Sequence, residues 1–109
     1  MPGPSVESLE KLIGTPRDGA LLRYSLGLEF SRLENHSKAS EHLRRAVELD
    51  PGYSAAWRAL GKALESAGNS SEALDAYRKG IAAAQHKGDK QAEKEMSVFA
   101  RRIEKRIAT

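Results

Sequence analysis

The stretch "ALGKALESAGNSSEALDAYRKGI" (Ala59–Ile81) has a near copy earlier in the chain, "SLGLEFSRLENHSKASEHLRRAV" (Ser25–Val47). The two stretches align at a constant offset of 34 residues, at which six positions are identical. A fixed period of this length is typical of a stacked array of helical units, because one unit cannot bury its apolar face alone. The identical pairs are Leu26 and Leu60, Gly27 and Gly61, Asn35 and Asn69, Ser37 and Ser71, Ala39 and Ala73, and Arg44 and Arg78.

Within each copy, apolar residues recur at the spacing of two successive α-helices. Leu22, Leu26 and Phe30 follow one another at steps of four, so they share one face of a helix. Each copy is therefore predicted to be a helical hairpin, in which Gly27 and its counterpart Gly61 let two backbones approach closely. The predicted core stripes are Leu22, Leu26, Phe30 and Leu33, then Ala39, Leu43, Ala46 and Val47, and in the second copy Trp57, Leu60 and Leu64, then Ala73, Tyr77, Gly80 and Ile81.

The turn residues of the two copies differ. Gly68 is suited to the left-handed conformation that ends a helix, and Asn69 with Glu72 is predicted to form a capping box for the next helix. Glu34 occupies the position equivalent to Gly68. Because a glutamate in the left-handed region costs about 1 kcal/mol, the first hairpin turn is expected to bend differently.

Composition restricts the fold and the function. A chain of 109 residues makes one small domain, and a sequence rich in Ala, Leu, Glu, Lys and Arg without alternating strand patterns predicts an all-α fold. The chain has no cysteine, which excludes disulfides and thiol chemistry and favours a reducing cytoplasm. The first residues do not resemble a signal peptide, no stretch is suited to span a bilayer, and the net charge is only +3.

The two copies resemble tetratricopeptide repeats. The family pattern has a large residue, then Leu-Gly, and later Ala and another large residue. The segments "WRALGKAL" (Trp57–Leu64) and "EALDAYRKG" (Glu72–Gly80) match this pattern, and the first copy matches it over Leu26–Pro51. The resemblance covers Ala20–Gln85 and implies a right-handed array of helical hairpins. It also implies that Trp57 is buried between the two hairpins. Arg23 departs from the pattern, because the family usually has an aromatic residue there.

The segments that flank the repeats are predicted to cap the array, because a short solenoid needs both ends covered. An apolar stripe on each flank indicates a short N-terminal helix and a long C-terminal helix. The stripes are Val6, Leu9, Leu12 and Ile13 at the N-terminus, and Ala92, Met96, Phe99, Ile103 and Ile107 at the C-terminus. The predicted division is an N-terminal segment 1–17, repeat one 20–51, repeat two 54–85 and a capping helix 88–109.

The resemblance implies a function in protein–protein interaction, with a peptide or a partner helix held in a concave groove that the first helices of the hairpins line. The predicted ligand-binding residues are Leu21, Tyr24, Leu28, Arg58 and Lys62. Apolar side chains beside two cations suit a ligand with apolar groups and an acidic group. The alternative, that the N-terminal segment or the capping helix covers this strip, stays open. The family's carboxylate clamp is excluded, because Leu28 and Ala59 occupy two of its asparagine positions.

A basic convex surface suggests a second function. The pair Arg44 and Arg45 recurs as Arg78 and Lys79, so stacking would bring four cations together, next to Arg101, Arg102, Lys105 and Arg106. Such a stripe would bind phosphates in a nucleic-acid or ribosome-associated accessory protein. A solvated face is the preferred interpretation, because Glu41 and Asp75 each precede a cation by four residues, the spacing of helical ion pairs.

No catalytic or metal-binding residue is predicted. His36 and His42 are six residues apart and do not share a helical face, and His86 lies near a helix end. The sequence therefore predicts a non-enzymatic, cytoplasmic module without a cofactor or metal. Its expected partner is another protein or peptide, not a nucleic acid or a membrane, and self-association stays open.

Overall fold

The computed structural model describes residues 5–108 and places six α-helices in that range. These are α1 (Val6–Glu10), α2 (Ala20–Arg32), α3 (His36–Leu49), α4 (Ser54–Ser66), α5 (Ser70–Lys87) and α6 (Lys90–Ala108). The predicted all-α fold is confirmed. Residues 1–4 of the predicted N-terminal segment and residue 109 of the predicted capping helix lie outside the described residues.

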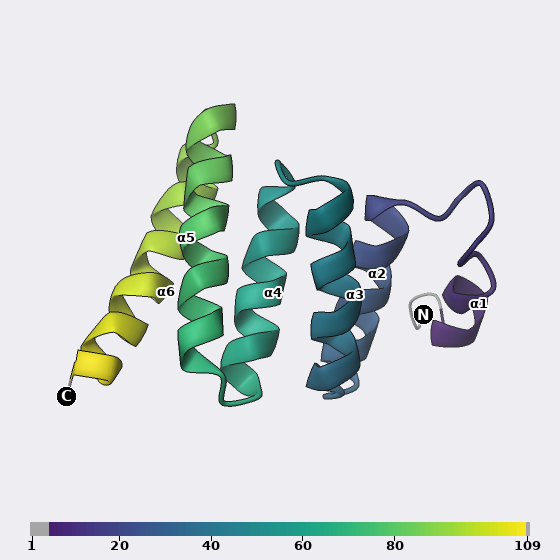
Figure 1. Cartoon of the computed structure of the whole chain (residues 1–109), viewed down its shortest axis with the longest axis horizontal. Helices are drawn as coiled ribbons and strands as arrows, with labels where there is room; N and C mark the ends of the chain where they lie inside the picture. Colours follow the sequence, from purple (N-terminus) through teal and green to yellow (C-terminus); the bar gives the residue numbers. More distant parts are fainter. Residues whose placement is uncertain (1–4, 109) are drawn as a thin grey trace.

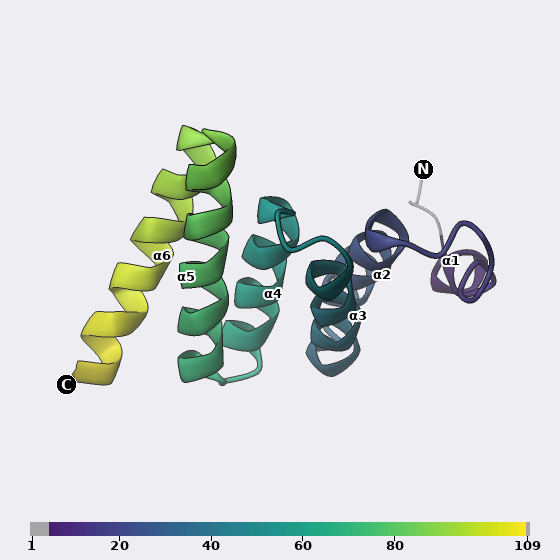
Figure 2. The ribbon, with the colours of Figure 1, turned by 45° about the horizontal axis from the view of Figure 1, so that its top comes forward.

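The helices form a single row of hairpins. Helix α2 packs on α3 to form the first hairpin, and α4 packs on α5 to form the second. The two hairpins contact each other through α3 and α4, and α6 packs on α5 (Figure 1). The row extends 43 Å along its longest axis, with α1 and α6 at opposite ends, and the second view in Figure 2 shows the same order. The predicted array of helical hairpins is therefore confirmed. Within the described residues, no helix combines the length and the apolar character that crossing a membrane requires.

The core of each hairpin depends on a glycine that faces a large side chain. Leu43 and Tyr77 occupy equivalent positions and are both fully buried. A Cβ atom on Gly27 would lie within 3.0 Å of the Leu43 side chain, and a Cβ on Gly61 would lie equally close to the Tyr77 ring. The close approach predicted at both glycines is confirmed, because any larger residue there would overlap its partner.

Three residues of the predicted core stripes are less buried than the sequence indicated: Leu33, Trp57 and Ile81, of which Ile81 is half-buried. Trp57 is only half-buried, and its indole Nε1 donates a hydrogen bond of 2.8 Å to the Pro51 carbonyl in the loop before α4. Trp57 does lie between the hairpins, among residues of α3 and α5, but the prediction that it is buried is wrong, because part of its ring remains at the surface. Leu33 is 55% exposed because α2 ends at Arg32 and Leu33 lies beyond its last turn.

The two hairpin turns have the same backbone path. Glu34 adopts a φ of 61° and Gly68 a φ of 86°, both in the left-handed region. In each turn, the N–H of the next residue donates to the carbonyl five residues before it, at 2.9 Å. The expectation that Glu34 makes the first turn bend differently is wrong. The hairpin packing that follows the turn holds Glu34 in the conformation that glycine adopts at lower cost.

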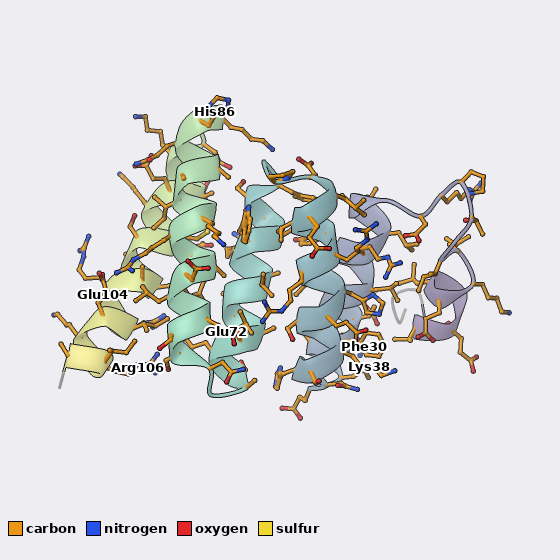
Figure 3. The ribbon with its side chains drawn as sticks, in the orientation of Figure 1. Phe30, Lys38, Glu72, His86, Glu104 and Arg106 are labelled. Carbon is orange, nitrogen blue, oxygen red and sulfur yellow. The ribbon has the colours of Figure 1, made fainter. Side chains whose placement is uncertain are left out.

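The predicted capping box at the second turn does not form. Asn69 lies at the N-cap position of α5, but its side chain makes no capping hydrogen bond. Glu72, labelled on α5 in Figure 3, pairs instead with Arg44 of α3. In the first turn, the Asn35 side chain does accept a hydrogen bond of 3.2 Å from the Lys38 N–H. An inter-helix ion pair has thus replaced the local cap in the second hairpin.

The two ends of the array are covered by unequal elements. At the N-terminal end, α1 packs on α2, and Val6 and Leu9 of α1 and Leu12 of the turn after it are half-buried, while Ile13 is 37% exposed. At the C-terminal end, α6 buries an apolar stripe against α5, but Ile107, the last residue of the predicted stripe, lies outside that contact. The buried residues of α6 are Met96, Ala100 and Ile103, whereas Ile107 is 51% exposed.

Arg23 organises the junction between the N-terminal segment and the first hairpin. Its guanidinium donates two hydrogen bonds to the Asp18 carboxylate, at 2.9 and 3.1 Å, and these bonds lower the pKa of Asp18 to about 2. The remaining nitrogen lies 3.3 Å from Nδ1 of His42, whose ring stacks on Phe30. The residue that departs from the family pattern therefore replaces an aromatic contact with a polar network.

Candidate functional site

A groove lies along the face that α2, α4 and α6 share. Its central hollow has a volume of about 380 Å³ and brings together four of the five residues predicted from the sequence, Tyr24, Leu28, Arg58 and Lys62. The complete lining is Tyr24, Leu28, Ser31, Arg58, Ala59, Lys62 and Glu95. The fifth predicted residue, Leu21, lies outside this hollow, in the first turn of α2. We call this surface the α2–α4–α6 groove.

The α2 wall of the groove is apolar and open. Leu21 is 68% exposed and Leu28 is 42% exposed, so both leave apolar surface on this face of α2. Tyr24 lies between them on the same face, and its ring contacts that of Tyr53 at a centroid distance of 4.9 Å. Helix α1 lies beyond α2 at the end of the row, so it leaves these two leucines uncovered (Figure 1).

Helix α6 supplies a wall that the sequence did not assign to the groove. Arg58 of α4 donates a hydrogen bond of 2.7 Å to Glu95 of α6, and this bond raises the pKa of Arg58. The charge of Arg58 is therefore compensated within the chain, although the side chain does line the groove. Sequence reasoning missed Glu95 because the 34-residue register ends before α6, so the approach of α6 to α4 could not be read from the repeat.

Phe99 and Arg102 of α6 lie beside Lys62, and the sequence did not associate either residue with the groove. Phe99 of α6 is half-buried, and both Lys62 Nζ and the Arg102 guanidinium carbon lie 5.1 Å from its ring centroid. The periodicity of α6 indicated that Phe99 belongs to the core stripe, and part of its ring does contact Tyr77 at a centroid distance of 5.5 Å. The remaining surface of the ring faces the two cations.

Beyond Lys62, the groove ends at a polar contact centred on Glu65. Glu65 of α4 accepts a hydrogen bond of 3.0 Å from the Tyr77 hydroxyl and one of 2.9 Å from Arg106 of α6. Burial, and next the nearby Glu65 carboxylate, raise the pKa of the Tyr77 phenol. Both carboxylate oxygens of Glu65 are therefore occupied by groups of this chain.

The opposite face, formed by α3 and α5, carries the repeated cations, and each of the four is paired with a carboxylate. Arg44 pairs with Glu72, Arg45 with Glu48 at 3.3 Å, Arg78 with Glu104 at 2.9 Å, and Lys79 with Asp75 at 3.1 Å. The predicted Asp75–Lys79 pair is confirmed, whereas the predicted Glu41–Arg45 pair is wrong because Arg45 turns to Glu48. A surface with matched acidic groups does not favour phosphate binding, so the nucleic-acid alternative is not supported.

A larger hollow of about 580 Å³ lies between α3 and α5, above α4. Its floor is apolar and includes Trp57 and Leu60, but its rim consists of the paired charges Arg44–Glu72 and Asp75–Lys79. In each ion pair the cation is already neutralised by its carboxylate, so the rim offers a ligand little unpaired charge. The α2–α4–α6 groove is the better candidate, because it combines the exposed Leu21 and Leu28 with Lys62, which forms no ion pair with a carboxylate among the described residues.

The histidines are not gathered into a site. His42 is buried against Phe30, and burial, followed by the nearby Arg23 charge, lowers its pKa. His36 is the first residue of α3, and His86 lies at the distant C-terminal end of α5 (Figure 3). Across residues 5–108, no three His, Asp or Glu side chains converge in a way that could hold a metal ion.

Comparison with known proteins agrees with this architecture. A TPR repeat-containing protein of Pseudomonas aeruginosa is 47% identical over 100 residues, which are 92% of this chain and 95% of that protein. The solution structure of a Bordetella parapertussis protein is 41% identical, with a TM-score of 0.80 and coverage of 96% of this chain and 91% of that chain. The Sgt2 TPR domain from Aspergillus fumigatus is 25% identical, with a TM-score of 0.78 and coverage of 95% and 69%.

The family assignment also rests on the repeats themselves. The sequence profile described as Tetratricopeptide repeat matches residues 24–87, which is more than half of the chain. That region contains the two hairpin turns and the buried pairs Gly27–Leu43 and Gly61–Tyr77. The chain belongs to the tetratricopeptide repeat family.

Proposed function

We propose that the chain is a non-enzymatic interaction module that binds a peptide or a partner helix in the α2–α4–α6 groove. Members of the tetratricopeptide repeat family generally serve as protein–protein interaction modules. The observation that carries the proposal is the exposed leucine strip on α2. Leu21 and Leu28 expose 68% and 42% of their surface next to a hollow, where a partner would bury them.

The spacing of the strip fits a helical or extended ligand. Leu21, Tyr24 and Leu28 follow at steps of three and four residues along α2, so they form one line down the groove wall. Partner helices are usually held by apolar anchors spaced in this way. Lys62 supplies a positive charge across from the strip, which suits a ligand that carries an acidic group.

Site-specific photocrosslinking tests where the partner binds. A photoreactive phenylalanine analogue at Leu28 reports on the groove, and the same analogue at Leu49 of α3 is a matched control. Both leucines are equally exposed, at 42% and 43%, but Leu49 lies outside the groove. The Leu28 probe is expected to capture a defined partner in cells of the source organism, and the Leu49 probe is not.

A double variant tests the contribution of the groove residues. Tyr24→Ala with Lys62→Glu is expected to abolish capture while the helical circular-dichroism signal is retained, because surface substitutions rarely alter the fold. Capture through Leu49 in place of Leu28, or unchanged capture by the double variant, would refute the groove as the binding surface. The proposal includes a cytoplasmic location, which imaging of a fluorescently tagged chain would test.

A further inference from the structure

The Phe99 ring lies against two cations that come from different helices. Lys62 extends from α4 and Arg102 belongs to α6, and each charged group lies 5.1 Å from the ring centroid. Among the residues that the structure describes, neither cation has a carboxylate oxygen within 4.0 Å, and Lys62 and Arg102 thereby differ from the paired cations of the opposite face. We call Lys62 and Arg102 the Phe99 cation pair.

The order of charges along the groove limits what can bind there. On one side of the Phe99 cation pair lies the Arg58–Glu95 ion pair, and on the other side lies the Glu65–Arg106 ion pair. Both flanking pairs are internally compensated. The uncompensated positive charge is therefore confined to one place, and a carboxylate of this chain stands on each side of it.

This arrangement favours a single compact anion over an extended one. A nucleic-acid strand carries a negative charge at every step, so its neighbouring phosphates would meet the carboxylates of Glu95 and Glu65. One carboxylate, in contrast, places a single negative charge beside the ring, where it can accept a charge-assisted hydrogen bond from either cation. The aromatic ring beneath the cations holds them in place before the anion arrives.

We propose that the Phe99 cation pair binds an aspartate or glutamate side chain of the partner polypeptide, and that an apolar side chain of the same partner packs on Leu28 and Tyr24. This inference rests on the proposed function, because it names the ligand chemistry of the same groove. Lys62, Leu28 and Tyr24 line one hollow, so a single short segment can reach both subsites. Helix α6 is then a part of the binding surface as well as a cap.

Selection from a random peptide library displayed on phage tests the inference without knowledge of the natural partner. Peptides selected on the full chain are expected to carry Asp or Glu at a fixed spacing from a large apolar residue. Arg102→Glu is expected to weaken their binding by about tenfold or more, as loss of a charge-assisted contact does. Arg101→Glu is the matched control, since it changes the same charge on the same exposed stretch of α6 but does not contact Phe99.

The outcomes separate this inference from the proposed function. Peptides that lose affinity for a Leu28→Ala chain, yet show no acidic preference and tolerate Arg102→Glu, would overturn the carboxylate site and leave groove binding in place. Equal losses from Arg101→Glu and Arg102→Glu would reveal a general charge effect and also overturn the site. Peptides that bind the Leu28→Ala chain undiminished would contradict the proposed function itself.

Discussion

The two hairpins share a backbone but solve the same packing problem with different side chains. At the central position, the first hairpin buries Leu43 and the second buries Tyr77, each against a glycine on the paired helix. At the outer edge, Arg23 of the first hairpin stands where the second has Trp57. The repeat therefore fixes where helices touch, whereas the side chain at each position sets how much stability and which polar contacts the hairpin gains.

The largest expected difference concerns the central pair. Tyr77→Ala should lower the free energy of unfolding by about 3 to 5 kcal/mol, because it removes the largest fully buried side chain and leaves a cavity. Leu43→Ala removes fewer atoms and should cost less, about 2 to 4 kcal/mol. Urea unfolding followed by circular dichroism measures both values. Tyr77→Phe isolates the hydroxyl bond to Glu65 and should cost about 1 kcal/mol.

A smaller difference is expected from the two glycines. Gly61→Ala should cost about 1 to 3 kcal/mol, because the new methyl group would overlap the Tyr77 ring, whose hydroxyl is fixed by Glu65. Gly27→Ala should cost less, since Leu43 can change rotamer to make room. Thermal melting of the two variants decides the order. Equal costs would mean that the Tyr77 ring shifts as freely as the leucine.

The hairpin turns should show an effect of opposite sign in the two copies. Glu34→Gly should raise the free energy of unfolding by about 0.5 to 1 kcal/mol, because it removes a side chain from the left-handed region. Gly68→Glu should lower it by a similar amount. Urea midpoints report both changes. A loss of stability in Glu34→Gly would show that the glutamate side chain stabilises the turn by a contact of its own.

The smallest effect is a pH dependence confined to the first hairpin, because His42 has Ala76 as its counterpart. Arg23 can only donate, so His42 Nδ1 must accept and the ring must be neutral. Burial and then Arg23 lower the pKa of folded His42 below 6.5, so the unfolded chain binds the proton first. The other groups that act on His42 are Glu41, Glu10 and Lys38, and Asp18 pairs with Arg23.

The sign of this effect follows from proton linkage. Neutral His42 makes its full contribution to the free energy of unfolding above the pKa of His42 in the unfolded chain. This contribution is lost as the pH falls from about 6.5 toward the lower pKa of His42 in the folded chain. The urea midpoint should therefore fall between about pH 7 and about pH 5, and by less in His42→Gln, which stays neutral. Over the same pH range, the hydrogen-exchange protection factors should fall in α2 and α3 more than in α4 and α5. A uniform fall across both hairpins would contradict the assignment to His42.

The sequence was sufficient to predict the repeated hairpins, because the period and the stripes reflect contacts within the hairpins. Gly27 and Gly61 identified the closest helix approach correctly. The burial of Trp57 was overestimated, because its indole N–H donates to the Pro51 carbonyl at the surface, a contact that no helical periodicity encodes. The Glu34 turn was misjudged because a local conformational cost of about 1 kcal/mol was weighed without the packing that outweighs it.

The candidate groove was predictable on two of its three walls. Tyr24, Leu28 and Lys62 lie on helices whose rotation is fixed by the repeat register, so their common face followed from their positions. Glu95 and Phe99 lie on α6, which does not follow that register, and their approach to α4 depends on how α6 packs on α5. Contacts between a repeat and a non-repeating cap are the part of such a fold that periodicity does not specify.

The placement of the chain ends has a mechanical consequence. The row is 43 Å long with α1 and α6 at its two ends, so a pulling force applied through the termini would load the helix interfaces in series. Each interface would then carry the full tension, and the weakest would yield first. The short α1, in which no residue is fully buried, is the element expected to detach at the lowest force, before either hairpin unravels.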